Sequence, residues 1–427
     1  MNPRKTSIEF LQDLIRIDTQ NPPGNELAAA LYIKEHADCL KLDSQLFTYD
    51  GNRGNIVIHL GPQTKDDLIL LGHLDTVIAE RSDWKYDPLE GKIVDGVMYG
   101  RGTLDMKYFI ACAMALMEEL SQQVSTFSRG ITFIFTSDEE RGSSSGLEML
   151  LEEEGMRERL SNRIVLNEGG GFALYDQSGQ CHYLYETGQK SVCRLRVKVR
   201  QSGTFNPYFP DLSHDRHLIE AVRRIQNLNV DSVHSATATS LSAIFGSCTD
   251  EATKRLIETM SRSIMTATLI HGGARNPELE TGVRASADFD CRLLPDVEKD
   301  SFLRKVEQAL EDLPVEISLL KFSKGYESFP DENFKEKMLQ SLQKADPSIV
   351  SLLPFVTPGS NDGKFLKPLG CDIFGFAPLV KTEPFTHILP LIHGIDERIS
   401  LDSIAFCHDV IGELVSGYLK GETHDQQ

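Results

Sequence analysis

The chain has 427 residues, enough for roughly two or three folding units that each bury a core. Its 44 Lys and Arg against 63 Asp and Glu give a net charge of −19, which disfavours a nucleic-acid partner because phosphate backbones are also negative. A hydrophobic share of 40% and a charged share of 25% indicate a globular protein, and no apolar run reaches the about 18 residues of a membrane span.

The N-terminal segment and the cysteines indicate a cytoplasmic protein. Glu9, Asp13 and Arg16 interrupt the apolar residues of segment 1–20, so we expect no secretory signal. The eight cysteines are widely scattered: Cys39, Cys112, Cys181, Cys193, Cys248, Cys291, Cys371 and Cys407. With no C-x-x-C pair, the pattern predicts reduced thiols and no cysteine-based zinc site.

Helical and strand patterns alternate through the first 168 residues. Thr6 and Glu9 form a capping box before apolar residues at helical spacing, and the turn 21–24 ends this first helix. Further helices are expected over 26–36, about 106–120 and after 142, and strands over 55–60, 67–71, 131–136 and 163–168. This alternation predicts an α/β fold whose mainly parallel sheet is covered by helices on both faces.

The pattern changes near residue 190. Four basic residues, Arg194, Arg196, Lys198 and Arg200, alternate with apolar ones, as in a half-exposed strand whose charged face is solvated rather than substrate-facing. Helices are then expected over 215–227, 251–262 and 297–311, and strands near 264–270, 285–292 and 315–322. We therefore predict a catalytic domain split into 1–187 and 326–427, with an inserted α+β domain over 188–325.

Polar residues gather where the predicted strands end. His73 and Asp75, two apart, share one face of a strand end, as expected for a metal-binding histidine oriented by a carboxylate or for a polar pair. Asp105 follows two glycines before a helix, which suits a ligand loop or a helix cap.

More carboxylates follow the next two strands. Asp138, Glu139 and Glu140 repel one another unless a cation or protons are shared among them, although acidic residues are also common where helices begin. Glu168 ends an apolar strand before three glycines, and His393 lies in a loop. Two histidines with several carboxylates indicate a divalent metal site, with enough ligands for two ions and one carboxylate left as a base.

The segments GHLDT, YGRGTLDMK, TSDEERGSSSG, LNEGG and HGIDERI occur in this order between residues 73 and 399. In this order and spacing they resemble the dinuclear zinc amidohydrolase and peptidase family of aminoacylase, acetylornithine deacetylase, succinyl-diaminopimelate desuccinylase, glutamate carboxypeptidase and carboxypeptidase S. The resemblance implies a split catalytic α/β domain with an inserted ferredoxin-like lid, through which such chains often form homodimers.

The resemblance also implies roles for individual residues. It assigns five ligands to two divalent ions, most simply zinc although cobalt or manganese would suit them: His73, Asp105, Glu140, Glu168 and His393. Asp105 would bridge the two ions. Glu139 would be the general base that deprotonates a metal-activated water, and Asp75 would orient His73.

The chain departs from the family after its first lid strand. The family has a Gly-His-Ala/Gly-Ser segment there, whose histidine stabilises the oxyanion, whereas Thr204 or Phe205 takes that position here. His214 and His217 lie further on and are expected at the surface. Losing an oxyanion donor commonly costs about 10²- to 10³-fold in rate.

Four residues are candidates to bind substrate by the same resemblance. Arg292, in a family-like Asp-Cys-Arg-Leu-Leu-Pro segment, would bind a substrate carboxylate or form a salt bridge within its strand. Asn276 belongs to an Asn-Pro remnant of a family loop. Ser360 and Asn361 lie in the turn 359–362, which resembles the family's pocket-lining turn.

These features together predict a metal-dependent hydrolase that cleaves the amide bond of a peptide or N-acyl amino acid, of the carboxypeptidase or aminoacylase (deacylase) type. Its partner would be a small-molecule substrate, with no nucleic acid and no membrane. Two alternatives stay open. The altered lid would make the enzyme amide-forming or otherwise biosynthetic, or the chain would be a catalytically silent peptide-binding protein.

Overall fold

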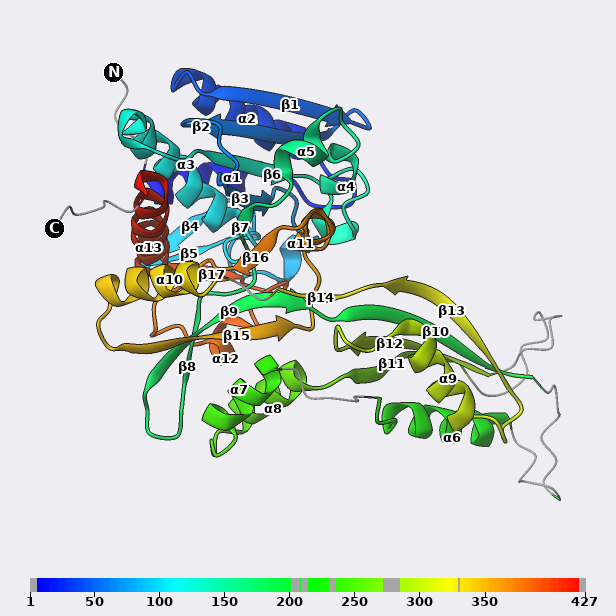
Figure 1. Ribbon diagram of the computed structural model, residues 1–427. Coiled ribbons are helices and arrows are strands. Elements are labelled where there is room, and N and C mark those ends of the chain that lie inside the picture. The colour runs from blue at the N-terminus through cyan, green and yellow to red at the C-terminus, as the bar shows by residue number, and fades with distance from the viewer. Residues whose placement is uncertain are drawn as a thin grey trace.

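The computed structural model describes residues 6–200, 208, 214–230, 236–271, 285–328 and 331–421 (Figure 1). Two sheets organise this part of the chain, a ten-stranded large sheet and a four-stranded small sheet, beside a three-stranded ribbon of order β17-β5-β4. The ribbon strands are β4 (Lys92–Val94), β5 (Val97–Tyr99) and β17 (Arg398–Ser400). No helix in the described ranges is long and apolar enough to cross a bilayer.

The large sheet has the order β1-β2-β6-β3-β7-β16-β9-β14, and β15 and β8 also pair with β9. Its strands are β1 (Asp43–Tyr49), β2 (Arg53–Leu60), β3 (Leu68–His73), β6 (Ile131–Thr136), β7 (Ile164–Asn167), β8 (Phe172–Tyr175), β9 (Cys181–Gln189), β14 (Tyr326–Glu327), β15 (Ile349–Thr357) and β16 (Asp372–Gly375). The central strands β6, β3, β7 and β16 run parallel, whereas β1, β2, β8 and β14 pair antiparallel. The expected α/β fold with a mainly parallel centre is confirmed.

Helices cover both faces of the large sheet, so its central strands are buried and mostly apolar. Along β3, Leu68 and Leu70 belong to one hydrophobic cluster, and Ile69 and Leu71 belong to another. The helices are α1 (Ser7–Arg16), α2 (Glu26–Cys39), α3 (Lys107–Ser121), α10 (Glu332–Ala345) and α13 (Leu401–Lys420) on the first cluster, and the short α4 (Leu147–Leu150), α5 (Met156–Leu160) and α11 (Gly363–Leu366) on the second. The predicted capping box is present at the start of α1, where Thr6 and Glu9 bond reciprocally.

The small sheet, of order β11-β12-β10-β13, lies apart from the large one and has its own apolar core (Figure 1). Its strands are β10 (Ser191–Val199), β11 (Ile264–His271), β12 (Ser286–Leu293) and β13 (Val315–Ser323), covered by α6 (His214–Gln226) and α9 (Lys299–Ala309). Two further helices, α7 (Ala236–Phe245) and α8 (Glu251–Ser261), pack instead into the core of the large sheet. The domain boundaries 1–187, 188–325 and 326–427 stay a prediction.

The differences from the expected elements have physical causes. The strand β1 was not predicted because its side chains are half-exposed and mixed in polarity. The sequence also did not predict β8, which has only four residues, or β9 and α7, whose residues mix polar with apolar types without a clear period. The helix expected after 142 is only the four-residue α4, preceded by a 3₁₀ turn at Glu139–Arg141.

Candidate metal centre and substrate cavity

Three adjacent parallel strands bring the predicted ligands to one edge of the large sheet. In the order β6-β3-β7, β3 ends at His73, β6 leads to Glu139 and Glu140, and β7 leads to Glu168. Ligand and substrate sites of parallel sheets lie at this edge because the carboxyl ends of the strands meet there. The loop before α3 adds Asp105. The loop between α12 (Phe385–Ile388) and β17 adds the fifth ligand, His393.

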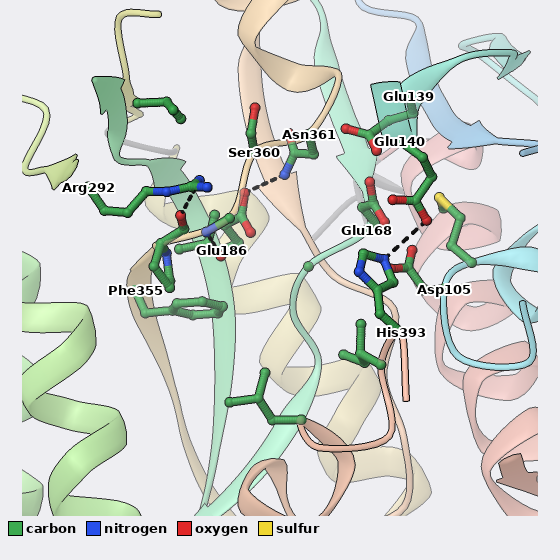
Figure 2. A pocket seen from close by; sticks show the side chains of 18 of the residues that line it. Asp105, Glu139, Glu140, Glu168, Glu186, Arg292, Phe355, Ser360, Asn361 and His393 are labelled. Carbon is green, nitrogen blue, oxygen red and sulfur yellow. Dashed lines mark hydrogen bonds and ion pairs between the residues drawn. The ribbon is translucent and has the colours of Figure 1, made fainter. Parts of the chain in front are cut away.

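The five predicted metal ligands come together as two groups that share one carboxylate, and Figure 2 shows four of them, Asp105, Glu140, Glu168 and His393. His73 Nε2 lies 3.0 Å from Asp105 Oδ1 and 3.4 Å from Glu168 Oε2. His393 Nε2 lies 3.0 Å from Asp105 Oδ2 and 3.1 Å from Glu140 Oε1. In each group the ligand atoms lie within 4.8 Å of one another, a donor set of imidazoles and carboxylates that suits borderline divalent ions.

The pKa shifts of the buried carboxylates and histidines also favour bound cations at this centre. Burial, reinforced by the charge of Glu168, raises the pKa of Glu139 well above its usual value, and burial likewise raises the pKa of Glu168. Hydrogen bonds to Asp105 and Glu140 raise the pKa of His393 to about 10. Divalent ions would reverse these shifts, since they favour ionised carboxylates and neutral imidazoles as ligands.

Asp75 is fully buried behind this centre. His73 Nδ1 lies 3.0 Å from the backbone carbonyl oxygen of Asp75 and 3.4 Å from its Oδ1. Asp75 Oδ1 accepts a hydrogen bond from the backbone N–H of Glu139 at 3.0 Å. Its Oδ2 accepts from the N–H of Glu140 at 3.1 Å and from Asn21 Nδ2 at 2.9 Å. Asp75 therefore links the ring of one ligand to the backbone that carries two other site residues.

Replacing Asp75 with alanine is expected to weaken metal binding about 10- to 100-fold, because partners that orient ligands contribute about that much affinity. Competition with a chromophoric chelator would measure the change. Asp43→Ala, in the edge strand β1, is the matched control and should bind metal normally. Unchanged affinity in the Asp75 variant would contradict the positioning role.

Two supporting residues escaped the sequence analysis. Asn21 donates to both Asp75 and Asp138, yet its Asn-Pro-Pro-Gly context signalled only a turn. Glu397 is fully buried, accepts from the backbone N–H groups of Gly102, Leu104 and Asp105, and pairs with Arg101 at 2.6 Å. It stands inside the HGIDERI segment, so the motif itself was the available signal.

A cavity of about 1420 Å³ extends from the metal centre to the small sheet. Three of the candidate substrate-binding residues, Arg292, Ser360 and Asn361, line it. The Arg292 guanidinium contacts both carboxylate oxygens of Asp290, at 2.5 and 3.1 Å, and the carbonyl of Pro358 at 2.9 Å. Arg292 thus makes the alternative strand salt bridge while facing the cavity.

The remaining predicted positions divide between described and undescribed residues. Asn276, Thr204 and Phe205 lie outside the described residues, whereas His217 is half-buried on α6. Of the basic row on β10, Arg194 lines the cavity and lies 3.7 Å from Asp290, and Arg196 pairs with Asp288 at 2.6 Å.

Comparison with known proteins identifies the class. The sequence profile of Peptidase family M20/M25/M40 matches residues 69–417. A protein named probable succinyl-diaminopimelate desuccinylase from Staphylococcus aureus strain N315 is 24% identical, over 97% of this chain and 98% of its own. Aminoacylase-1 of Dictyostelium discoideum is 22% identical, over 96% and 97%.

A solved structure shares the fold. The M20 family metallo-carboxypeptidase of Sulfolobus solfataricus superposes with a TM-score of 0.72 and 16% identity, covering 97% of this chain and 99% of that one. The chain belongs to Peptidase family M20/M25/M40. It is a metal-dependent hydrolase of amide bonds, and the amide-forming and catalytically silent alternatives are not favoured.

Proposed function

We propose that the protein uses two zinc ions to hydrolyse the amide bond of a small peptide or N-acyl amino acid. The proposal rests on the position of Asp105. Its two carboxylate oxygens each lie 3.0 Å from a different histidine. A carboxylate that faces two imidazoles in this way suits a bridging ligand between two ions. His73 and Glu168 would complete one site, and Glu140 and His393 the other.

Zinc is the proposed metal because both groups mix imidazole with carboxylate, although cobalt and manganese accept the same donors. When bound, the ions supply a Lewis acid that polarises the scissile carbonyl and favours ionisation of the attacking water. The protein's own carboxylates hold the ions in place and handle the proton.

Glu139 is the proposed general base. It lines the cavity and is almost fully buried, and among the described residues it belongs to neither ligand group. It would take a proton from the attacking water and pass that proton to the leaving nitrogen, so one side chain serves both halves of the reaction. Asp75 would fix its position through the backbone N–H of Glu139.

The small-sheet wall of the cavity favours an anionic group on the substrate. Arg194, Arg292 and Lys321 line this wall, whereas the cavity's carboxylates come from the large-sheet side. Arg194 and Lys321 are register partners on β10 and β13, so their positive charges are neighbours. We therefore place the substrate carboxylate here, near Ser360 and Asn361, with Asn276 as a further contact.

Arg292→Ala is expected to raise KM about 10- to 100-fold with a smaller change in kcat, since a hydrogen bond to a charged group contributes about 1.5–3 kcal/mol. Steady-state kinetics on a turned-over N-acyl amino acid would measure it. Arg196→Ala is the matched control, because Arg196 lies in the same sheet with its own aspartate partner. Equal KM in both variants would leave Arg292 as a structural salt bridge.

The proposed function is tested by mass spectrometry of products from zinc-loaded protein, incubated with a panel of dipeptides and N-acyl amino acids with and without chelator. Chelator-sensitive release of free amino acids is expected. Absence of release from protein with two verified metal ions would overturn hydrolysis of this substrate class.

We also propose that the protein is cytoplasmic and that it forms a homodimer through the insert at 188–325. The scattered cysteine pattern supports a reducing compartment. The edge strands of the small sheet expose apolar side chains, Leu269 and Ile270 on β11 and Leu319 and Leu320 on β13, which supports an interface there. Light scattering coupled to size exclusion would give the mass, and a monomer at micromolar concentration would contradict the dimer.

A further inference from the structure

We propose that Glu186 forms a subsite that binds an ammonium group of the substrate, so that the enzyme prefers amides carrying a free amine. This inference rests on the proposed amide hydrolysis and narrows its substrate class. Glu186 belongs to β9 and is not among the predicted ligands. It is 2% exposed, and it lines the same cavity as the metal centre.

The carboxyl group of Glu186 is held in a defined orientation. Its Oε1 accepts a hydrogen bond from Asn361 Nδ2 at 2.6 Å. Asn361 is fixed in turn, because its N–H donates to Gln189 Oε1 at 2.7 Å and its Oδ1 accepts from the N–H of Gly363 at 3.0 Å. The other oxygen of Glu186, Oε2, has no hydrogen-bond donor among the described residues.

Three glycines pack closely around Glu186, where a larger residue would collide with it. A Cβ added at Gly169 would collide with Glu186 Oε2, one at Gly170 with the backbone of Glu186, and one at Gly375 with Glu186 Cβ. Gly169 and Gly170 belong to the glycine run after Glu168, which the metal chemistry leaves unexplained. Because Gly169 has no side chain, the free oxygen of Glu186 lies against the residue that follows a metal ligand.

Glu186 lies between the metal centre and the basic wall of the cavity. Figure 2 places its carboxyl between Glu168 on one side and Arg292 on the other, with the bond to Asn361 drawn. A substrate whose amide lies at the metal centre and whose carboxylate points to the small sheet would therefore pass Glu186. The group it presents there must donate a hydrogen bond to Oε2.

A cation satisfies this carboxyl better than a neutral donor does. No basic side chain in the described part of the chain forms an ion pair with Glu186, and neither ligand group includes it. A buried carboxylate without a counter-charge is costly, so it needs a proton or a positive partner. No donor from the described residues bonds to Glu186 Oε2. A substrate ammonium group would donate a hydrogen bond to this oxygen and supply the positive charge.

The experiment compares substrates that differ only by an ammonium. The pairs are alanyl-alanine with propionyl-alanine, for an amine on the acyl side, and Nα-acetyl-lysine with Nα-acetyl-norleucine, for an amine on the leaving side. Each is assayed with zinc-loaded wild type, Glu186→Gln and Glu148→Gln. Glu148 is the matched control because it is an exposed carboxylate that lines the same cavity.

In at least one pair, wild type is expected to favour the ammonium member about 10- to 100-fold in kcat/KM, the value of one charged hydrogen bond. Glu186→Gln should lose this preference by slowing only the ammonium member, and Glu148→Gln should keep it. Glu186→Asp, which retains the charge, should keep part of it if the Gln variant does not fold.

Two results would overturn the subsite. Wild type would hydrolyse both members of each pair equally, or Glu186→Gln would slow both members of the preferred pair alike. Hydrolysis of none of the four compounds by protein with two metal ions would instead count against the proposed function. Equilibrium binding of the four compounds would then decide the subsite separately, with tighter binding of the ammonium members expected.

Discussion

Glu139→Gln is expected to reduce kcat by about 10²- to 10⁴-fold while the protein keeps both metal ions, because general-base catalysis contributes about that factor. Glutamine preserves the size and burial of the side chain but cannot accept the water's proton. Glu139 makes no contact that the two ligand groups need among the described residues. Product mass spectrometry would give the rate, and elemental analysis the metal content.

The comparison variant for this result is Glu140→Gln, which changes the neighbouring carboxylate. Glu140 lies 3.1 Å from His393 and belongs to a ligand group, so its variant should lose metal as well as activity. A Glu139→Gln protein that hydrolyses substrate normally with both ions bound would remove Glu139 from the mechanism.

Asp105→Ala is expected to abolish activity and to weaken both metal sites by more than about 100-fold. Asp105 is the member common to the two ligand groups, so its loss leaves each site with two protein ligands. Even partners outside the ligand set contribute about 10- to 100-fold in affinity, and a direct ligand contributes more. Metal titration followed by elemental analysis would measure the stoichiometry.

Single-site variants give the matched comparison. His73→Ala removes a ligand of one group and His393→Ala a ligand of the other, so each should retain about one tightly bound ion per chain. Thermal melting would verify that all three proteins fold. Two ions bound with wild-type affinity in Asp105→Ala would contradict the bridging role.

The fold was largely predictable where the sequence pattern was strong. The strand 131–136 was predicted with its observed bounds, because a run of buried apolar residues lies between turns. The edge strand β1 was not, because an edge strand is half-exposed and needs no apolar run. The packing of α7 and α8 into the large core was also not predicted, because α7 was not expected as a helix and both segments lie within the range assigned to the insert.

The candidate metal ligands were predictable for a different reason. His73, Asp105, Glu140, Glu168 and His393 each stand in a recognisable segment, and a metal site needs particular donor atoms that few residue types offer. Residues that support these ligands are less constrained in type. Asn21 and Glu397 act on their neighbours through backbone and side-chain hydrogen bonds, and only their positions in space reveal them.

The sequence by itself determined the α/β class, the family resemblance and, through that resemblance, the candidate ligand set, because periodicity and short motifs leave local marks on residue type. Only the tertiary structure decided which ligands meet, through the sheet order β6-β3-β7 that aligns three strand ends. It alone also placed Glu186, on a strand that the sequence pattern did not predict, in the cavity wall with one carboxyl oxygen that accepts no hydrogen bond from the described residues. Contacts between distant segments arise from packing, which no single stretch of sequence encodes.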